Sequence, residues 1–354
     1  MYIVLAIIAF GVLILVHEGG HFFAARLCGV KVNEFAIGMG PKILKKQGKE
    51  TLFTLRLLPF GGFCALEGED EETGDERAFA AKPKWQRVII LCAGAAMNFL
   101  IGLILLFCIM PWMNVAEPVI AGFMEGCPYV GEDALMEGDR ILRVDGHRIF
   151  FTTDFSEYMS RGGDDVHTIV LRRDGERVVL KDFTMSLVAY PTDSGGSVMK
   201  YGLYFQPRGD GLWTNLRYTW YEGVGFVRLV WRSLGDLFTG AVGLRDFSGP
   251  VGVVGYVNEV EQQTTSALEA FFTFFYIFSL IAVNLAVVNL LPIPGLDGGR
   301  IFLLIVTSVI EGVSGKKLNP KYEGYINMAG LVLLLSLSAY ILFNDVWKLF
   351  SAAP

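Results

Sequence analysis

Hydrophobic residues are concentrated in four long blocks separated by polar segments, and this pattern predicts the architecture. The blocks are Tyr2–Ala25, Val88–Met113, Ala270–Leu291 and Ile326–Phe343. Each is long enough for an α-helix to cross a bilayer, whose hydrocarbon core is about 30 Å thick. The first block lacks the basic start and small-residue cleavage site of a secretory signal peptide, so we expect it to remain as a helix. With 53% hydrophobic residues and a mean hydropathy of +0.45, the chain is predicted to be a polytopic α-helical membrane protein.

Two histidines and a glutamate interrupt the first block as His17-Glu18-Gly19-Gly20-His21. In a helix, His17 and His21 lie about 40° apart on one face, and Glu18 flanks them. Ionisable groups at membrane depth cost about 3 kcal/mol each, so they are rarely kept without a partner or a function. Two imidazoles at this spacing can bind one Zn²⁺ while the carboxylate acts as a base. A chance match is the alternative, and the cost of burial in a membrane argues against it.

A third metal ligand is expected, because catalytic zinc usually has three protein ligands. Asp297 follows the third block in the segment Asn289-Leu-Leu-Pro-Ile-Pro-Gly-Leu-Asp297-Gly-Gly, where two prolines break the helix. Irregular backbone at membrane depth is tolerated only where it lines a cavity or is buried in protein. We therefore favour Asp297 as the third ligand over a solvated aspartate at a helix end.

Basic residues indicate which segments face the cytoplasm. Lysine and arginine are frequent between the first two blocks, and Lys316, Lys317 and Lys321 lie between the last two. The positive-inside rule then places both loops in the cytoplasm, and it places both termini and the segment from Asn114 to Ala267 outside. Because His17 and Glu18 lie about 22 Å into the first helix, the metal site is expected in the membrane, toward its cytoplasmic side.

The first cytoplasmic loop contains apolar segments with high β-propensity. Residues 51–59 and 60–66 read as two strands joined by Pro-Phe-Gly-Gly, and residues 35–41 as a further short strand. Such a membrane-associated β-hairpin near the metal could pair with an extended substrate by strand addition. A small sheet that merely covers the cytoplasmic helix ends is an equally weighted alternative.

The segment between the second and third blocks predicts a compact, extracytoplasmic α+β unit. Short strands and turns run from Pro118 to Gln206, and an aromatic, arginine-containing amphipathic helix is expected from Trp213 to Gly240. This helix either lies at the outer membrane interface or packs on the β-rich unit. The predicted domains are residues 1–113, 114–208, 209–266 and 267–354.

Charge and cysteine content exclude other classes of protein. The net charge is −6, with no basic stripe, so nucleic acid is not an expected partner. The five cysteines are odd in number, widely spaced and include no CxxC pair, so they indicate neither a disulfide framework nor a thiolate zinc site, and free thiols are expected.

The motifs together resemble the site-2 protease family of intramembrane zinc metalloproteases, in its bacterial PDZ-containing branch of the regulator of sigma-E protease type. The resemblance covers nearly the whole chain. It includes His17-Glu18-x-x-His21, Gly61-Gly62-Phe63, Ala93-Gly94-x-x-x-Asn98, Gly138-Asp-Arg-Ile-Leu-Arg-Val-Asp-Gly146, Ser248-Gly-Pro-Val-Gly252 and Asn289-x-x-Pro-x-Pro-x-x-Asp297-Gly. Three departures exist: Ala95 replaces a frequent proline, Phe63 replaces a frequent tyrosine, and only one PDZ unit is present.

The resemblance implies four transmembrane helices in a bacterial cytoplasmic membrane, with Zn²⁺ bound by His17, His21 and Asp297. It also implies Glu18 as general base, and substrate contacts from Asn289, Gly61, Gly62 and Phe63. The implied substrates are single-pass membrane proteins, such as anti-sigma factors and remnant signal peptides. No Gly-Leu-Gly-Phe-type signature precedes the strand at Val119, so peptide binding by the PDZ-like unit and a steric role both stay open.

Two other functions are compatible with parts of the sequence. A catalytically silent, zinc-binding membrane adaptor would need no base, so the presence of Glu18 argues against it. A metal transporter would require inverted repeats or several polar spans, and neither is seen.

Overall fold

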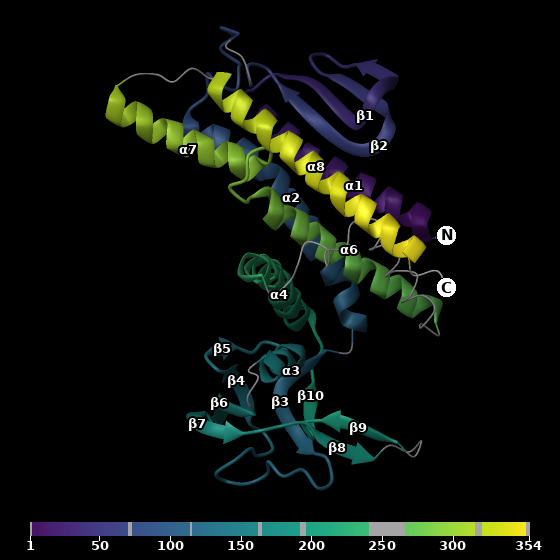
Figure 1. Cartoon of the computed structure of the whole chain (residues 1–354), viewed down its shortest axis with the longest axis vertical. Helices are drawn as coiled ribbons and strands as arrows, with labels where there is room; N and C mark the ends of the chain where they lie inside the picture. The colour runs from purple at the N-terminus through teal and green to yellow at the C-terminus, as the bar shows by residue number, and fades with distance from the viewer. Residues whose placement is uncertain are drawn as a thin grey trace. The chain divides into compact units, whose positions relative to one another are not determined.

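The structure is a computed structural model that describes residues 2–69, 73–113, 115–161, 165–191, 196–240, 266–315 and 321–351. The chain forms two compact units, one made of Met1–Ile109 with Glu222–Pro354 and the other of Met110–Tyr221. The Ser248–Gly252 motif lies outside the described residues. Figure 1 shows the helices and strands of both units.

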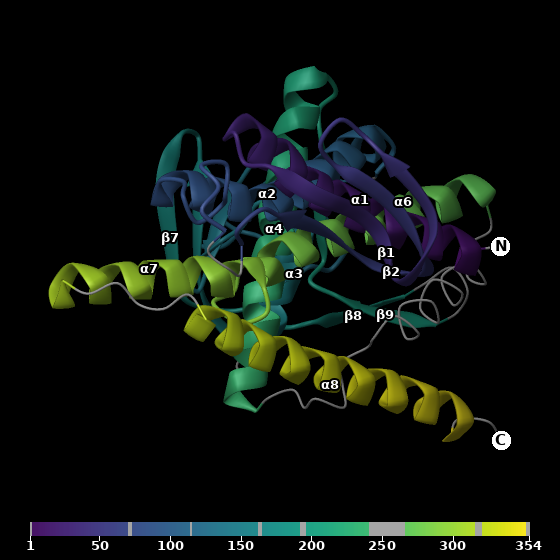
Figure 2. The same cartoon turned by 90° about the horizontal axis from the view of Figure 1, so that it is seen from above.

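Four helices of the first unit are long and apolar enough to cross a membrane, as the hydrophobic blocks predict. They are α1 (Tyr2–Leu27), α2 (Lys84–Ile109), α6 (Ala267–Asn289) and α8 (Lys321–Ser351). Helices α1, α2 and α6 lie side by side in both views (Figures 1 and 2). Leu13 of α1 packs with Phe274 and Phe278 of α6 in a shared apolar core.

Glycines allow these helices to approach closely. A Cβ atom added to Gly20 of α1 would lie 2.4 Å from the carbonyl oxygen of Ala93 in α2. Likewise, a Cβ on Gly102 of α2 would lie 2.9 Å from a methyl group of Val283 in α6. Small residues at such crossings bring helix backbones into van der Waals contact, which is the main source of helix association within a membrane.

The loop after α1 folds into a sheet built from two long, bent strands, β1 (Val32–Gln47) and β2 (Leu52–Leu66). The predicted pairing of residues 51–59 with 60–66 is wrong. Both segments lie within one long strand, β2. The two halves of β2 pair with opposite sides of the N-terminal half of β1, since Ala36 is paired with Thr54 and with Phe63. Gly38 and Gly61 have φ values of +83° and +76°, a backbone conformation that glycine adopts without strain and that accompanies the bends.

One half-buried acid links parts of this sheet. The carboxylate of Glu34 in β1 accepts hydrogen bonds from Thr54 at 2.7 Å, from Arg56 at 2.8 Å and from Lys42 at 2.9 Å. Burial disfavours the charge on Glu34, but these three donors outweigh it and hold its pKa at about 2. The contacts join the N-terminal half of β1 to β2 and to the C-terminal half of β1.

An 18-residue helix, α7 (Asp297–Ser314), lies between α6 and α8, where the sequence predicts only a loop leading to Lys316. Its outer face exposes large apolar side chains, among them Phe302, Ile305 and Val309. The helix is amphipathic and is not among the candidate spans of the described residues, which is why a search for long apolar blocks does not find it.

The second unit contains an antiparallel sheet in the order β10-β3-β4-β6-β7, with the short β5 beside β4, and a separate two-stranded sheet of β8 and β9. The strands are β3 (Ala116–Phe123), β4 (Arg140–Val144), β5 (His147–Arg148), β6 (Val166–Arg173), β7 (Glu176–Thr184), β8 (Val188–Pro191), β9 (Ser197–Lys200) and β10 (Leu203–Pro207). A short 3₁₀ helix (Met110–Trp112) precedes them, and α3 (Thr152–Arg161) packs on one face of the sheet through Phe155 and Tyr158. Helix α4 (Leu212–Thr239) begins in this unit and continues into the first.

We predict that Gly20→Ala destabilises the protein whereas Gly19→Ala does not. The added methyl group at Gly20 meets the backbone of α2, and overpacking of this kind costs about 1–3 kcal/mol. A Cβ added at Gly19 would have no other atom within 4 Å, so this residue of the same helix turn is the matched control. Thermal unfolding in detergent measures both variants, and equal midpoints would contradict the packing argument.

Candidate metal centre

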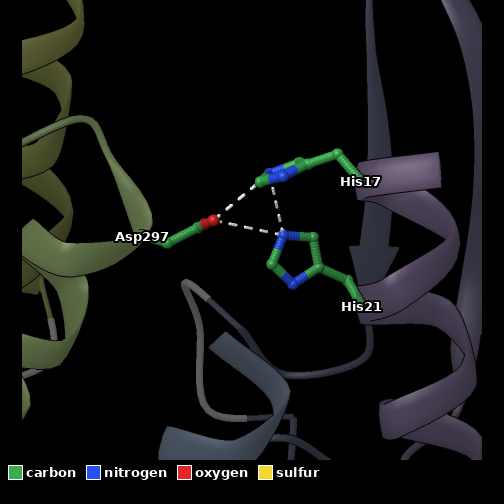
Figure 3. Close-up of side chains that lie close together, drawn as sticks. All are labelled: His17, His21 and Asp297. Carbon is green, nitrogen blue, oxygen red and sulfur yellow. Dashed lines mark hydrogen bonds and ion pairs between the residues drawn. The ribbon is translucent and has the colours of Figure 1, made fainter. Parts of the chain in front are cut away.

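Helix α1 presents His17 and His21 on one face, as the four-residue spacing predicts. Their rings are nearly perpendicular, and their Nε2 atoms lie 3.2 Å apart. His21 is buried and His17 is half-buried. Figure 3 shows both rings projecting from α1 toward the same point.

Asp297 reaches this point from the first turn of α7. Its Oδ2 atom lies 3.2 Å from Nε2 of His17 and 3.3 Å from Nε2 of His21 (Figure 3). A negative charge in the first turn of a helix is favoured by the helix dipole. Of the described residues, His17, His21 and Asp297 are the one group with the composition and proximity to hold a metal ion.

The geometry of the three atoms fits zinc. Ligand atoms at 2.0–2.1 Å from a tetrahedral ion lie about 3.3 Å from one another, so the observed triangle has the dimensions of one face of such a tetrahedron. Asp297 Oδ2 is buried without a hydrogen-bond donor, which is costly for a carboxylate unless a cation compensates it. Two imidazoles and one carboxylate leave the fourth position open, as in catalytic rather than structural zinc sites.

Backbone and side-chain groups orient the two rings. His21 Nδ1 lies 2.8 Å from the carbonyl oxygen of Ile90, so Nδ1 holds the ring proton and the lone pair of Nε2 faces the centre. His17 Nδ1 lies 3.4 Å from the side-chain nitrogen of Asn98 and 3.5 Å from that of Asn289. Oδ1 of Asn98 is buried without a partner, and turning the amide over would bring it to His17 Nδ1 as an acceptor.

Glu18 lies beside the three ligands but outside the group that could hold the metal. The backbone of Cys64 in β2 is within hydrogen-bonding reach of its carboxylate. A Cβ on Gly62 would lie 3.2 Å from Cγ of Glu18, so the strand and the acid are in direct contact. A carboxylate next to an open metal position, and not bound to the metal, has the arrangement required of a general base.

The other residues of the predicted strand edge have different surroundings. Gly61 packs against the side chain of Met39, and the ring of Phe63 lies under the guanidinium of Arg56 at 4.7 Å. Of the three predicted contacts in β2, the structure therefore brings Gly62 to the metal centre, while Gly61 and Phe63 flank it along the strand.

Three features of the site were not assigned from the sequence. Asn98 is 1% exposed, and the signal that could have revealed it is an amide within an apolar helix, four residues after Gly94. Gly94 is needed for space, since a Cβ there would lie 2.4 Å from His21 Nε2. Arg300, one turn after Asp297, forms an ion pair with Glu69, which follows β2, and so ties the start of α7 to the sheet.

Comparisons with known proteins agree with this geometry. The model of Peptidase family M50 matches residues 5–337. A Clostridium perfringens protein provisionally named a zinc metalloprotease is 33% identical over 98% of both chains. The Bacillus licheniformis zinc metalloprotease RasP is 28% identical over 97% of this chain and 98% of its own. The Bacillus subtilis regulator of sigma-W protease RasP is 27% identical over the same shares.

We predict that His17→Ala and Asp297→Ala each lower the zinc content of the purified protein well below one ion per chain. Each change removes one of the three atoms that converge on the centre. His147→Ala, an exposed histidine of the second unit, is the control and should leave the content unchanged. Metal analysis by mass spectrometry measures the result, and full retention by Asp297→Ala would assign the third ligand elsewhere.

Proposed function

Because the chain belongs to Peptidase family M50 and resembles zinc metalloproteases along its whole length, it is a zinc metalloprotease of the site-2 type, and we propose that His17, His21 and Asp297 hold its zinc. With four apolar helices, it is an integral membrane protein. The observation that supports this assignment best is the triangle of 3.2–3.3 Å between the three ligand atoms, with Glu18 beside it.

The residues around the centre divide the chemical work of peptide hydrolysis. When bound, zinc would polarise the scissile carbonyl and make water more acidic. Glu18 takes a proton from the attacking water and delivers it to the leaving amine, which is general base and then general acid catalysis. The carbonyl of Ile90, and the amide oxygen of Asn98 once that amide is turned over, keep the two imidazoles in the tautomer that leaves Nε2 free for the metal.

We propose that β2 also holds the substrate. Residues 62–66 are paired with β1 on one side, and among the described residues no strand pairs with their other side. This free edge lies next to Glu18 through Gly62 and Cys64. A transmembrane helix shields its peptide bonds, so cleavage requires an extended stretch, and strand addition at this edge would hold it extended. Gly61, Gly62 and Phe63 are the contacts we expect, with Asn289 at the other side of the centre.

The proposed substrates are single-pass membrane proteins cut within or near their transmembrane segments. The Bacillus subtilis relative is named a regulator of sigma-W protease, which favours regulated intramembrane proteolysis of a membrane-bound regulator such as an anti-sigma factor. Remnant signal peptides are a second group of the same chemistry. From the distribution of lysine and arginine, we propose that the basic loops face the cytoplasm of a bacterial cell and that both termini lie outside. The metal centre then lies in the membrane, toward its cytoplasmic side.

For the second unit we propose a PDZ-like domain whose groove differs in position from the one expected. In a PDZ-like unit, the ligand-binding loop is expected before Val119. In the structure, the free edge beside the cavity belongs instead to β10 (Leu203–Pro207), which is paired only with β3 in the described sheet. A cavity of about 510 Å³ lies between β10 and α3, lined by Phe155, Leu203 and Phe205 among others. Its apolar lining and open strand edge favour an extended peptide as ligand over a purely steric role.

We predict that Glu18→Gln binds zinc as the wild type does but loses proteolysis by a factor of about 10² or more. The amide keeps the shape of the side chain and cannot accept the proton. Zinc content and cleavage of a single-pass substrate in proteoliposomes are measured together. Cleavage at the wild-type rate would exclude Glu18 as the base, and a wild type that cuts no membrane substrate would favour the adaptor function.

Asn98 and Asn289 should separate into two roles. We expect Asn98→Ala to lower zinc retention in a chelator titration, because this buried amide orients His17. We expect Asn289→Ala to keep its zinc and to raise KM, because its proposed partner is the substrate. Comparing the chelator midpoint and KM for both variants tests this. If the two variants lose zinc equally, Asn289 is a positioning residue for His17 instead.

A further inference from the structure

A basic cavity lies in the second unit, and none of the proposed metal ligands lines it. It has a volume of about 410 Å³, within the range of small-molecule sites, and fourteen residues line it, none of them acidic. Hydrophobic side chains and tyrosines form part of the wall. The charged part consists of six arginines, Arg140, Arg143, Arg148, Arg172, Arg177 and Arg217.

Strand register places these arginines against one another. Arg140 of β4 is paired directly with Arg172 of β6, and Arg172 is paired directly with Arg177 of β7. On the other side of β4, Arg143 is paired with Arg148 of β5. Like charges directly opposite on adjacent strands are destabilising, and here they form a continuous row across three strands. Such a row is expected where an anion compensates it.

The protein supplies little of that compensation. Glu117 is the acid next to the cavity, and it is shared by Arg140, Arg217 and the hydroxyl of Tyr218. Burial and this hydrogen bond raise the pKa of Tyr218 to about 12, so its hydroxyl stays a donor. Among the residues that the structure describes, Arg172 and Arg177 have no ion-pair partner, and both are exposed. The guanidinium groups are thus free to bind a ligand.

We propose that this cavity binds the phosphate of an anionic phospholipid headgroup. Arginine forks match the oxygens of phosphate in pairs, which makes several converging arginines a phosphate site. Arg217, Tyr218 and Tyr221 come from the start of α4, and the same turns expose Trp213, which is 83% accessible, and Trp220. Exposed tryptophans on an amphipathic helix are typical of the membrane–water interface, where headgroups lie. This favours a lipid over a soluble acidic peptide.

The test uses the full-length protein in zwitterionic detergent with a short-chain phosphatidylglycerol as probe. Short-chain phosphatidylcholine, inorganic phosphate and an Asp/Glu-rich peptide are the comparison ligands. We expect phosphatidylglycerol to bind most tightly of the four, and Arg177→Gln to weaken it about tenfold. Lys181→Gln, an exposed cation farther along β7 and outside the cavity, is the matched control and should change nothing. Arg172→Gln with Arg177→Gln should have a larger effect than either alone.

The thermal stability of the variants and the selectivity among the four ligands decide the outcome. Thermal midpoints show whether the variants fold, and Arg172→Lys with Arg177→Lys, which keeps both charges and removes the forks, should bind with intermediate affinity. The proposal is overturned if Arg177→Gln and Lys181→Gln bind phosphatidylglycerol equally. It is also overturned if inorganic phosphate binds as tightly as the lipid, which would indicate a free-phosphate site, or if the acidic peptide is preferred, which would indicate a protein partner.

Discussion

Close approach of backbones is the constraint on which the metal centre depends. Three ligand atoms can lie 3.2–3.3 Å apart only if the segments that bear them are nearly in contact. Glycine makes this possible at each crossing. Gly20 lets α1 touch α2, Gly94 leaves room for the His21 ring, and Gly298 sits where a Cβ would lie 2.3 Å from the backbone of Leu290. A side chain at Gly94 would displace the His21 ring, one at Gly298 would push the first turn of α7 off Leu290, and one at Gly20 would push α1 away from α2.

The turn that delivers Asp297 follows from the same constraint. Prolines follow the end of α6, and a short turn precedes α7, which leaves irregular backbone next to the membrane-spanning helices. Its polar groups are satisfied locally, since Leu296 N–H donates to Ile293 O and Arg300 N–H donates to Leu296 O. Helix α8 closes over the turn, where Gly330 packs against the carbonyl of Pro294. The aspartate is therefore held by a rigid turn rather than by a solvated loop.

The sequence predicts the convergence of His17, His21 and Asp297 better than it predicts the sheet beside them. His17, His21 and Asp297 are detectable because ionisable residues at membrane depth are costly without a function. The strand pairing is not detectable, because Pro-Phe-Gly-Gly has the composition of a turn, yet β2 continues through it and wraps β1 on both sides. Asn98 is a single amide with no spacing partner. The arginine row was equally hidden, since its members are scattered from 140 to 177 and only the strand register aligns them.

The metal centre and the arginine cavity both hold charges that an ion of opposite sign can compensate, but the two sites differ in their exposure to water. At the proposed metal centre, Oδ2 of Asp297 is buried without a hydrogen-bond donor, and a cation held at contact distance would compensate its charge. At the arginine cavity, Arg172 and Arg177 keep contact with water, which lowers the cost of their mutual repulsion and allows an anion to come and go. Dissolved salt screens the second interaction strongly and the first hardly at all. The fold thus places the proposed cation site at a buried carboxylate oxygen, and the proposed anion site at arginines that stay exposed.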